Sequence, residues 1–349
     1  MSGRALLLAP SHHLGGGIER YAETLESAFA MRGVEYRRID LQCPGPAAHA
    51  RMLAEGRRAL RESKTPARLV LAHRALLPVA WLLARDACVN GISVICHGAE
   101  AWTDRSGPRS VIENGIMRRT SVRVIAVSNF TAGALSDCCS ATVLPPGLSP
   151  LWFRMLAAAS RSYRSTSGSY QILTAFRLSD WRSKGLPEIM QAVTSLGRSD
   201  VRLVICGSGT PPSDLLRAVR ERSFCTLRPG LGDAELARQF AEADLFVLAT
   251  RTRAGRFACG EGFGLVLLEA QLAGTPVVAP AYGGCREAFI EGVTGVAPAD
   301  ESAAELARTL AGLLESPEQL AQMGNRGACW AQDAFAPERY ARMAMSKLL

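Results

Sequence analysis

Several patterns that mark well-known classes of protein are missing from this chain of 349 residues. None of its ten cysteines forms a CxxC pair or has a histidine at zinc-finger spacing, so neither a zinc site nor a dithiol redox centre is expected. No apolar run approaches the roughly 20 residues needed to span a bilayer, and the apolar stretch near the N-terminus is too short for a signal peptide. We therefore expect a cytoplasmic protein with reduced cysteines.

Three more absences concern kinds of ligand. The GxGxxG spacing of dinucleotide-binding loops does not occur, which disfavours an NAD-dependent dehydrogenase. No DxD pair is present, so a metal ion bridging a diphosphate has no support, and neither a metal nor another cofactor is predicted. No Lys/Arg-rich helix with interleaved aromatic residues stands out, so nucleic acid is not an expected partner.

The composition that remains is that of a globular protein, with 48% apolar and 21% charged residues. The length suffices for two domains of ordinary size. The net charge of +8 is uneven, because residues 1–160 carry 19 Arg or Lys against 12 Asp or Glu, whereas the remainder carries 21 against 20. A basic first half can meet an anionic membrane surface or an anionic substrate.

Short apolar strands alternate with amphipathic helices along both halves, which predicts a doubly wound parallel α/β fold. In the first half we expect strands at 4–10, 34–41, 69–72, 92–96, 123–127 and 142–144, and helices at 18–32, 47–63, 76–88 and 131–135. The alternation restarts at 170–176 after an Ala/Ser/Arg-rich stretch, 157–169, that reads as a linker. Ser128 precedes a helix and is interpreted as its N-cap.

The stretch from Gly260 to Pro280, GEGFGLVLLEAQLAGTPVVAP, predicts a loop, a helix, a turn and a strand. Glycines at a helix start let backbone approach a ligand, and the free N–H groups there attract phosphate. Glu261 lies in the loop and Glu269 lies inside the apolar helix. A buried acid needs a partner, and sugar or ribose hydroxyls would serve.

Three other positions have both a functional and a structural interpretation. Arg177 and Lys184 follow a strand and precede a helix, where they can hold a diphosphate or form a solvated basic loop. The glycine run at 15–17 follows the first strand and is either a phosphate loop or a plain turn. His97 ends a strand, where ligands of open α/β sheets bind, but a lone histidine there is often structural. His73 has little support.

Taken in order, these motifs resemble the retaining glycosyltransferases of glycosyltransferase family 4, which have the GT-B fold. The resemblance covers nearly the whole chain and is strongest from Arg177 to Pro298. It rests on the following segments: GGGIE (15–19), HGAE (97–100), AVSNFTA (126–132), LPPG (144–147), RLSDWRSKG (177–185), ICGSG (205–209), EADLFVLAT (242–250), EGFGLVLLE (261–269), AGTPVVAP (273–280) and EGVTG (291–295).

The resemblance implies two facing Rossmann-like domains with the active site in the cleft between them. Residues 1–160 would form the acceptor-side domain, 161–331 the donor-binding domain, and a final helix at 332–349 would pack back onto the first. It implies a catalytic set and a donor-binding set. The catalytic set is His97, Glu261, Arg177 and Lys184. The donor-binding set is Gly16, Gly17, Phe263, Gly264, Leu265 and Glu269.

Each residue has an implied role. Glu261 would contact the hydroxyls of the transferred sugar and Glu269 would hold the ribose. Arg177 and Lys184 would hold the diphosphate without a metal. Backbone N–H groups of 263–265 would meet sugar and phosphate, Gly16 and Gly17 would meet the phosphate from the first domain, and His97 would lie near the donor sugar.

The expected reaction moves a hexose from a nucleotide sugar, UDP before GDP, to a hydroxyl of a glycan, lipid-linked or small-molecule acceptor. The basic first half would allow peripheral contact with the inner face of a membrane. Two alternatives stay open at this point, an epimerase-like enzyme on the same fold and a non-catalytic partner subunit. The segment 250–260, TRTRAGRFACG, departs from the family pattern with Arg251, Arg253 and Arg256, and it would touch an anionic acceptor or cover the donor.

Overall fold

The computed structural model describes residues 4–11, 17–63, 65–102, 107–160, 168–253 and 258–349. These residues form two compact units. The first contains the described part of 1–150 together with Ala258 and Pro337–Leu349, and the second contains the described parts of 151–253 and 259–336. The chain therefore passes from the first unit to the second after Pro150 and returns to the first after Ala336.

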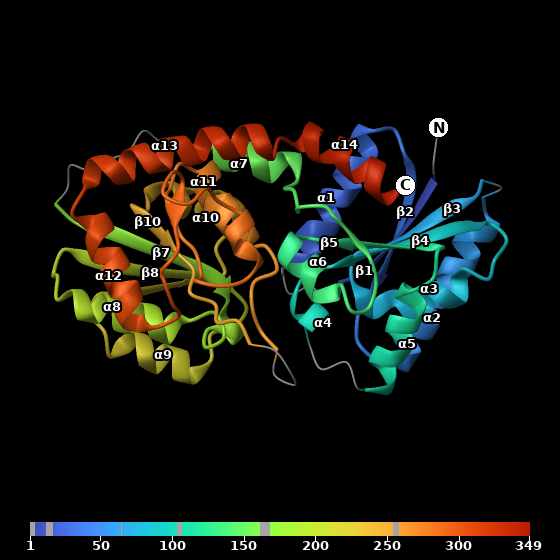
Figure 1. Cartoon of the computed structure of the whole chain (residues 1–349), viewed down its shortest axis with the longest axis horizontal. Coiled ribbons are helices and arrows are strands. Elements are labelled where there is room, and N and C mark those ends of the chain that lie inside the picture. The colour runs from blue at the N-terminus through green and yellow to red at the C-terminus, as the bar shows by residue number, and fades with distance from the viewer. Residues whose placement is uncertain (1–3, 12–16, 64, 103–106, 161–167, 254–257) are drawn as a thin grey trace. The chain divides into compact units, whose positions relative to one another are not determined.

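The first unit is built on a six-stranded parallel sheet with the strand order β2-β1-β3-β4-β5-β6 (Figure 1). Its strands are β1 (Arg4–Pro10), β2 (Glu35–Leu41), β3 (Ala67–Leu71), β4 (Val89–Cys96), β5 (Val122–Ala126) and β6 (Ala141–Val143). Its helices are α1 (Gly17–Met31), α2 (Pro46–Arg61), η1 (Arg74–Leu76), α3 (Leu77–Leu83), α4 (Ala99–Trp102), α5 (Pro108–Met117), α6 (Asn129–Leu135) and α14 (Pro337–Leu348). The central strands are buried along most of their length because helices cover both faces of a parallel sheet.

The second unit repeats this plan with the strand order β12-β11-β10-β7-β8-β9. Its strands are β7 (Tyr170–Arg177), β8 (Val201–Ser208), β9 (Cys225–Pro229), β10 (Leu245–Val247), β11 (Val277–Val278) and β12 (Gly295–Val296). Its helices are α7 (Pro150–Ala159), η2 (Leu178–Asp180), α8 (Leu186–Leu196), α9 (Ser213–Arg220), α10 (Asp233–Glu242), α11 (Leu265–Leu272), η3 (Gly284–Glu287), α12 (Ala303–Leu314) and α13 (Pro317–Ala334). The predicted doubly wound α/β class is confirmed.

The C-terminal helix α14 packs against α1 in the first unit (Figure 1). Tyr340 of α14 meets Tyr21 of α1 edge to face, with 6.5 Å between the ring centroids. A Cβ at Gly147 would lie 2.5 Å from Cγ of Tyr340, so only glycine lets the chain pass so close to this ring. The hydroxyl of Ser93 on β4 donates to the carbonyl of Leu348 across 2.6 Å, which holds the end of α14 against the sheet.

Some predicted elements differ from the observed ones. Residues 157–159, expected in a linker, form the last turn of α7, and 161–167 lie outside the described residues. The helix expected at 76–88 ends at Leu83. The stretch 332–349, expected as one helix, holds the end of α13 and all of α14, separated by Phe335 and Ala336. Ser128 is an N-cap as predicted, because its hydroxyl accepts the N–H of Thr131.

Each sheet has a switch point, which is the place where the order of the strands reverses direction. On one side of this point successive strands are added toward one edge of the sheet, and on the other side toward the opposite edge. In the first unit this point lies between β1 and β3, and in the second between β7 and β10. Ligands of open parallel sheets bind beyond the carboxyl ends of the strands at such points. The two edges are therefore where functional side chains should be sought.

Candidate active site

Lys184 and Glu261 meet beyond the carboxyl ends of β7 and β10. Nζ of Lys184 lies 2.5 Å from Oε1 of Glu261, and the hydroxyl of Thr250 donates to the same oxygen across 2.9 Å. The exposed fractions of the two charged side chains are 26% and 13%. A charge removed from water is costly unless it has a partner of opposite sign. Here Lys184 and Glu261 are each other's partner.

Two glycines fix the backbone on either side of this pair. Gly185 has φ +74°, and a Cβ there would lie 1.9 Å from the carbonyl oxygen of Ala249. The turn that presents Lys184 can therefore press against the end of β10 only with glycine at 185. Gly283 has φ +112°, and the next residue, Gly284, donates its N–H to the carbonyl of Glu261 across 2.8 Å. The backbone of Glu261 is thereby tied to the segment after β11.

Arg177 is the last residue of β7 and is exposed. The structure shows no hydrogen bond or ion pair between its guanidinium and any residue that it describes. The sequence places Arg177 seven positions before Lys184, with η2 and the following turn between them. A guanidinium at a strand end can bind two oxygens of a phosphate at once.

The helix predicted within 260–280 is α11, which begins at Leu265 after Gly264 in the left-handed region at φ +81°. The first N–H groups of a helix have no partner within it, so this end favours an anion. The ring of Phe263 is buried and contacts Phe335 at 5.9 Å between centroids. Glu269 lies on the second turn, and Oε1 of this carboxylate accepts the indole N–H of Trp152 across 2.9 Å.

The arginines of the segment 250–260, which departs from the family pattern, have different surroundings. Arg251 forms an ion pair with Glu188 on the first turn of α8, with 2.5 Å between nitrogen and oxygen. Arg253 and Cys259 form an antiparallel bridge through two backbone hydrogen bonds of 2.9 and 3.0 Å. Arg256 lies outside the described residues. Arg251 therefore holds the segment before Glu261 against α8, a role that the sequence did not suggest.

His97 follows β4 in the first unit, at the carboxyl edge of the sheet. Its Nε2 lies 2.7 Å from the carbonyl oxygen of Ala72 and donates to it, and its backbone N–H donates to Oε1 of Glu100. Burial lowers the pKa of His97 below the ordinary value of histidine, against the opposing effect of Glu100. The neutral ring therefore carries its proton on Nε2, which leaves Nδ1 as an acceptor.

Two aromatic rings enclose His97. The ring of His73 stacks on it, with 6.2 Å between centroids and 10° between planes, and Tyr21 meets it edge to face at 5.0 Å. His73 is itself fixed, because its Nδ1 accepts the N–H of Ala75 at the start of η1. Sequence reasoning gave His73 little weight, although its place after β3, one strand from His97 in the sheet, was the available signal.

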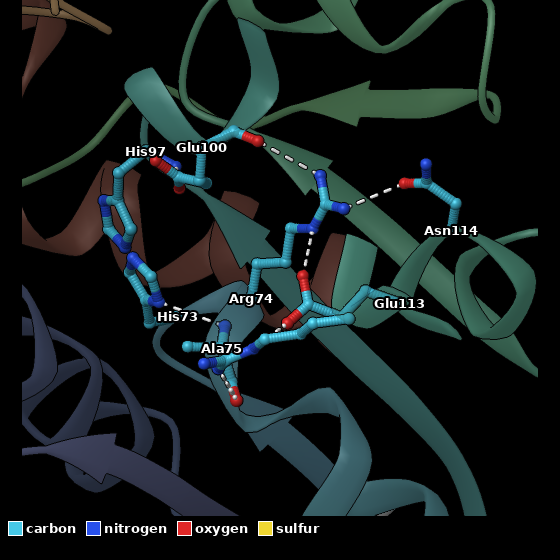
Figure 2. A network of polar contacts seen from close by, with 8 residues as sticks. His73, Arg74, Ala75, His97, Glu100, Glu113 and Asn114 are labelled. Atoms are coloured by element: carbon cyan, nitrogen blue, oxygen red, sulfur yellow. Dashed lines mark hydrogen bonds and ion pairs between the residues drawn. The ribbon is translucent and has the colours of Figure 1, made fainter. Parts of the chain in front are cut away.

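Arg74 ties the segments around these histidines together (Figure 2). Its guanidinium donates to Glu113 across 2.8 Å, to Asn114 across 2.8 Å and to the backbone carbonyl of Glu100 across 3.1 Å. Arg109 binds the other oxygen of Glu113 at 2.8 Å. The network joins α4 and α5 to η1, and it holds Glu100 under the His97 backbone. Sequence analysis did not identify it.

The glycine loop after β1 lies mostly outside the described residues, and Gly16 is among those not described. Gly17 opens α1 and is exposed, and no described atom lies within 4 Å of a Cβ placed there. Packing against the described residues therefore does not require glycine at 17. Among the described residues no group of three or more His, Cys, Asp or Glu is arranged to hold a metal ion, and none of the described helices is long and apolar enough to cross a membrane.

Known proteins resemble this chain in sequence and in fold. Residues 158–330 match the model of a family described as glycosyl transferases group 1. The chain is 31% identical over 319 residues to the GDP-mannose-dependent alpha-(1-6)-phosphatidylinositol monomannoside mannosyltransferase of Mycobacterium tuberculosis, which covers 86% of this chain and 80% of that protein. It is 31% identical over 231 residues to a D-inositol 3-phosphate glycosyltransferase of Pseudarthrobacter chlorophenolicus, with coverage of 61% and 52%.

Among solved structures, the fold is similar to that of sucrose-phosphate synthase from Thermosynechococcus elongatus. The TM-score is 0.79 at 18% identity, and the match covers 99% of this chain and 98% of that one. Together with the two six-stranded parallel sheets, this confirms the predicted GT-B fold.

Proposed function

Because the chain belongs to the family of group 1 glycosyl transferases, and is therefore a glycosyltransferase that uses a nucleotide sugar, we propose that its second unit binds that donor beyond β7 and β10. The observation that carries the proposal is the contact between Lys184 and Glu261 at 2.5 Å, at the switch point of the sheet. The two halves would then act as an acceptor-side domain, 1–160 with 332–349, and a donor-binding domain, 161–331.

In this proposal the donor lies along the start of α11. Arg177 forms bidentate hydrogen bonds with the diphosphate, and Lys184 binds it as a point charge. An ammonium has three N–H donors, so Lys184 can keep its bond to Glu261 and add a phosphate oxygen. Glu261 then accepts hydrogen bonds from hydroxyls of the sugar, and Glu269 accepts hydrogen bonds from those of the ribose. Backbone N–H groups of 263–265 donate to the sugar and the phosphate.

The proposed reaction transfers a hexose with retention of its anomeric configuration. The bond between the anomeric carbon and the diphosphate oxygen breaks, and the acceptor oxygen bonds to that carbon on the same face. The acceptor's proton passes to the departing phosphate oxygen, so no protein base is needed. Arg177, Lys184 and the N-terminus of α11 stabilise the charge that develops on the leaving diphosphate, which supports a reaction without a metal ion.

The first unit would contribute the acceptor side of the site. His97 is suited to accept a hydrogen bond from a hydroxyl group at Nδ1. Its Nε2–H donates to the carbonyl of Ala72, and Nδ1 keeps its lone pair. Gly16 and Gly17 are retained as a proposed phosphate contact from this side.

The donor and acceptor are proposed as classes. The named donor of the mycobacterial relative is GDP-mannose, so GDP-mannose should be tried first, with UDP sugars beside it. Both curated relatives act, by their names, on compounds of phosphorylated inositol. A phosphorylated glycan or lipid-linked acceptor also agrees with the net positive charge of residues 1–160.

The same charge leads us to propose contact with an anionic membrane surface. Arg57, Arg58 and Arg61 line a hollow of about 450 Å³ with Ala54 and Glu62 at the end of α2. Helices of a parallel α/β unit run opposite to the strands, so this end of α2 belongs to the amino edge of the sheet. The hollow is therefore no part of the acceptor site. Binding to anionic liposomes that falls with salt would support the membrane proposal, and absence of binding at low salt would refute it.

The decisive experiment combines donor binding with product analysis. A matching nucleotide sugar should raise the melting temperature of the protein, because it binds only the folded state. Transfer to an inositol-containing acceptor in the presence of EDTA, with NMR of the product's anomeric centre, then tests metal independence and retention. Conversion of the donor without any acceptor would identify an epimerase instead. Absence of stabilisation by every nucleotide sugar would favour a non-catalytic partner subunit.

A further inference from the structure

Trp152 lies outside the region that matches the family model, yet it contacts a proposed donor-binding residue. It precedes the matched region, 158–330, by six residues, and it lies on the first turn of α7. Its indole Nε1 donates to Oε1 of Glu269 across 2.9 Å, between residues 117 positions apart. Both side chains are buried, with exposed fractions of 4% for Trp152 and 9% for Glu269.

This contact has the properties of a positioning bond. A tryptophan side chain has one hydrogen-bond donor, on a rigid ring with only two rotatable bonds. That donor is directed at Glu269, and a hydrogen bond to a charged acceptor is stronger than a neutral one. A carboxylate has about four lone-pair positions on its two oxygens, so the indole bond restricts rotation of the carboxylate and occupies one of these positions.

We propose that Trp152 is a positioning residue of the donor site, and that it orients the Glu269 carboxylate to accept the ribose hydroxyls of the nucleotide. The inference rests on the proposed function, in which Glu269 binds the ribose. It adds that recognition of the ribose depends on a side chain from α7, next to the point where the chain enters the second unit at Leu151.

The test is discrimination between nucleotides with and without ribose hydroxyls. Dissociation constants of GDP and 2′,3′-dideoxy-GDP, and of the corresponding UDP pair, are measured by calorimetry for the wild type, Trp152→Phe and Glu269→Gln. For whichever base binds, the wild type should prefer the ribonucleotide by roughly tenfold to a hundredfold, the range for hydrogen bonds to a charged group. Trp152→Phe keeps an aromatic ring but removes the N–H, and its preference should fall to within about threefold.

Two further variants complete the design. Leu151→Ala, at a neighbouring position of α7 that is 64% exposed, should leave the preference unchanged. The double variant Trp152→Phe/Glu269→Gln should lose no more discrimination than Glu269→Gln alone, because both changes act on one interaction.

The outcomes separate this inference from the proposed function. If Trp152→Phe weakens both nucleotides equally, Trp152 only packs against α11 and the inference is wrong, while the donor site stands. If the wild type itself shows no preference, Glu269 does not bind the ribose and both proposals fail. Should Trp152→Phe not fold, the wild-type protein answers the question by NMR: the Trp152 indole N–H resonance should shift with GDP or UDP and not with the dideoxy form. An equal shift with both forms would contradict the inference.

Discussion

The ammonium of Lys184 lies 2.5 Å from a carboxylate oxygen of Glu261, although 77 positions separate the two residues in the chain. Both charges are largely removed from water, and they come from the segments that follow neighbouring strands of the sheet. The pair therefore places two opposite charges at the switch point of the second sheet, where a ligand is expected to bind.

Lys184→Ala should lower kcat/KM by well over about tenfold, because in the proposed site it removes a charge that acts on the leaving diphosphate. Glu261→Ala should have an effect of at least similar size. Steady-state kinetics with the identified donor measures the loss, and circular dichroism confirms that the fold persists. Near-wild-type rates from either variant would refute the assignment of this site.

Gly185→Ala should destabilise the protein by at least about 3 kcal/mol, because the new Cβ would overlap the carbonyl oxygen of Ala249. Gly197→Ala is the matched control at the other end of α8. It also has positive φ, at +61°, but no described atom lies within 4 Å of its Cβ. It should cost only the left-handed backbone conformation, about 1–2 kcal/mol. Urea denaturation measures both, and equal losses would show that the close approach to Ala249 is not constraining.

Arg74→Met should reduce the free energy of unfolding by about 3–5 kcal/mol, because Glu113 would lose its buried partner. The exposed fractions of these two side chains are 3% and 9%. Arg109 pairs with the same carboxylate but is 62% exposed, so Arg109→Ala should cost about 1 kcal/mol or less. Urea or thermal denaturation compares the two, and similar losses would mean that burial of Arg74 contributes nothing.

The pH dependence of stability should carry a contribution from His97. Burial lowers the pKa of this histidine in the folded protein, so the unfolded chain binds the proton more readily. Stability from this source is fully present above about pH 6.5, the ordinary pKa of histidine, and is lost as the pH falls toward the lowered value. His97→Gln should therefore reduce the drop in urea midpoint between pH 7.5 and 5.5. An unchanged drop would contradict the assignment.

The sequence predicted best those features that depend on neighbouring residues. The strand at 4–10, the helix within 260–280 and the N-cap Ser128 follow from local signals, since apolar runs and a capping residue before the first turn suffice. The strand ends next to Arg177 and His97 could also be predicted from the sequence, because a buried strand is a short apolar run that is followed by polar residues.

What escaped prediction depends on contacts between distant residues. The helix α5 has Val111 and Ile112 exposed, so its sequence shows no clean apolar face. Arg74 and Glu113 are 39 positions apart, and nothing local marks them as partners. The segment with Arg251 is expected to touch an anionic acceptor or to cover the donor, and nothing local indicates the ion pair of Arg251 with Glu188. Such pairings follow from the order of strands in the sheet, which the sequence pattern does not specify.

Two aromatic contacts, Trp152 with Glu269 on α11 and Phe335 with Phe263 just before α11, bear on how this enzyme can be divided and recombined. Trp152 lies just after the chain enters the second unit, and Phe335 lies just before the chain leaves it. A fragment limited to the family-matching residues 158–330 would lack both. It would leave the Glu269 carboxylate without the indole N–H and uncover the ring of Phe263. A chimera that grafts the second unit onto the first unit of a relative should therefore place its junctions before Leu151 and after Ala336.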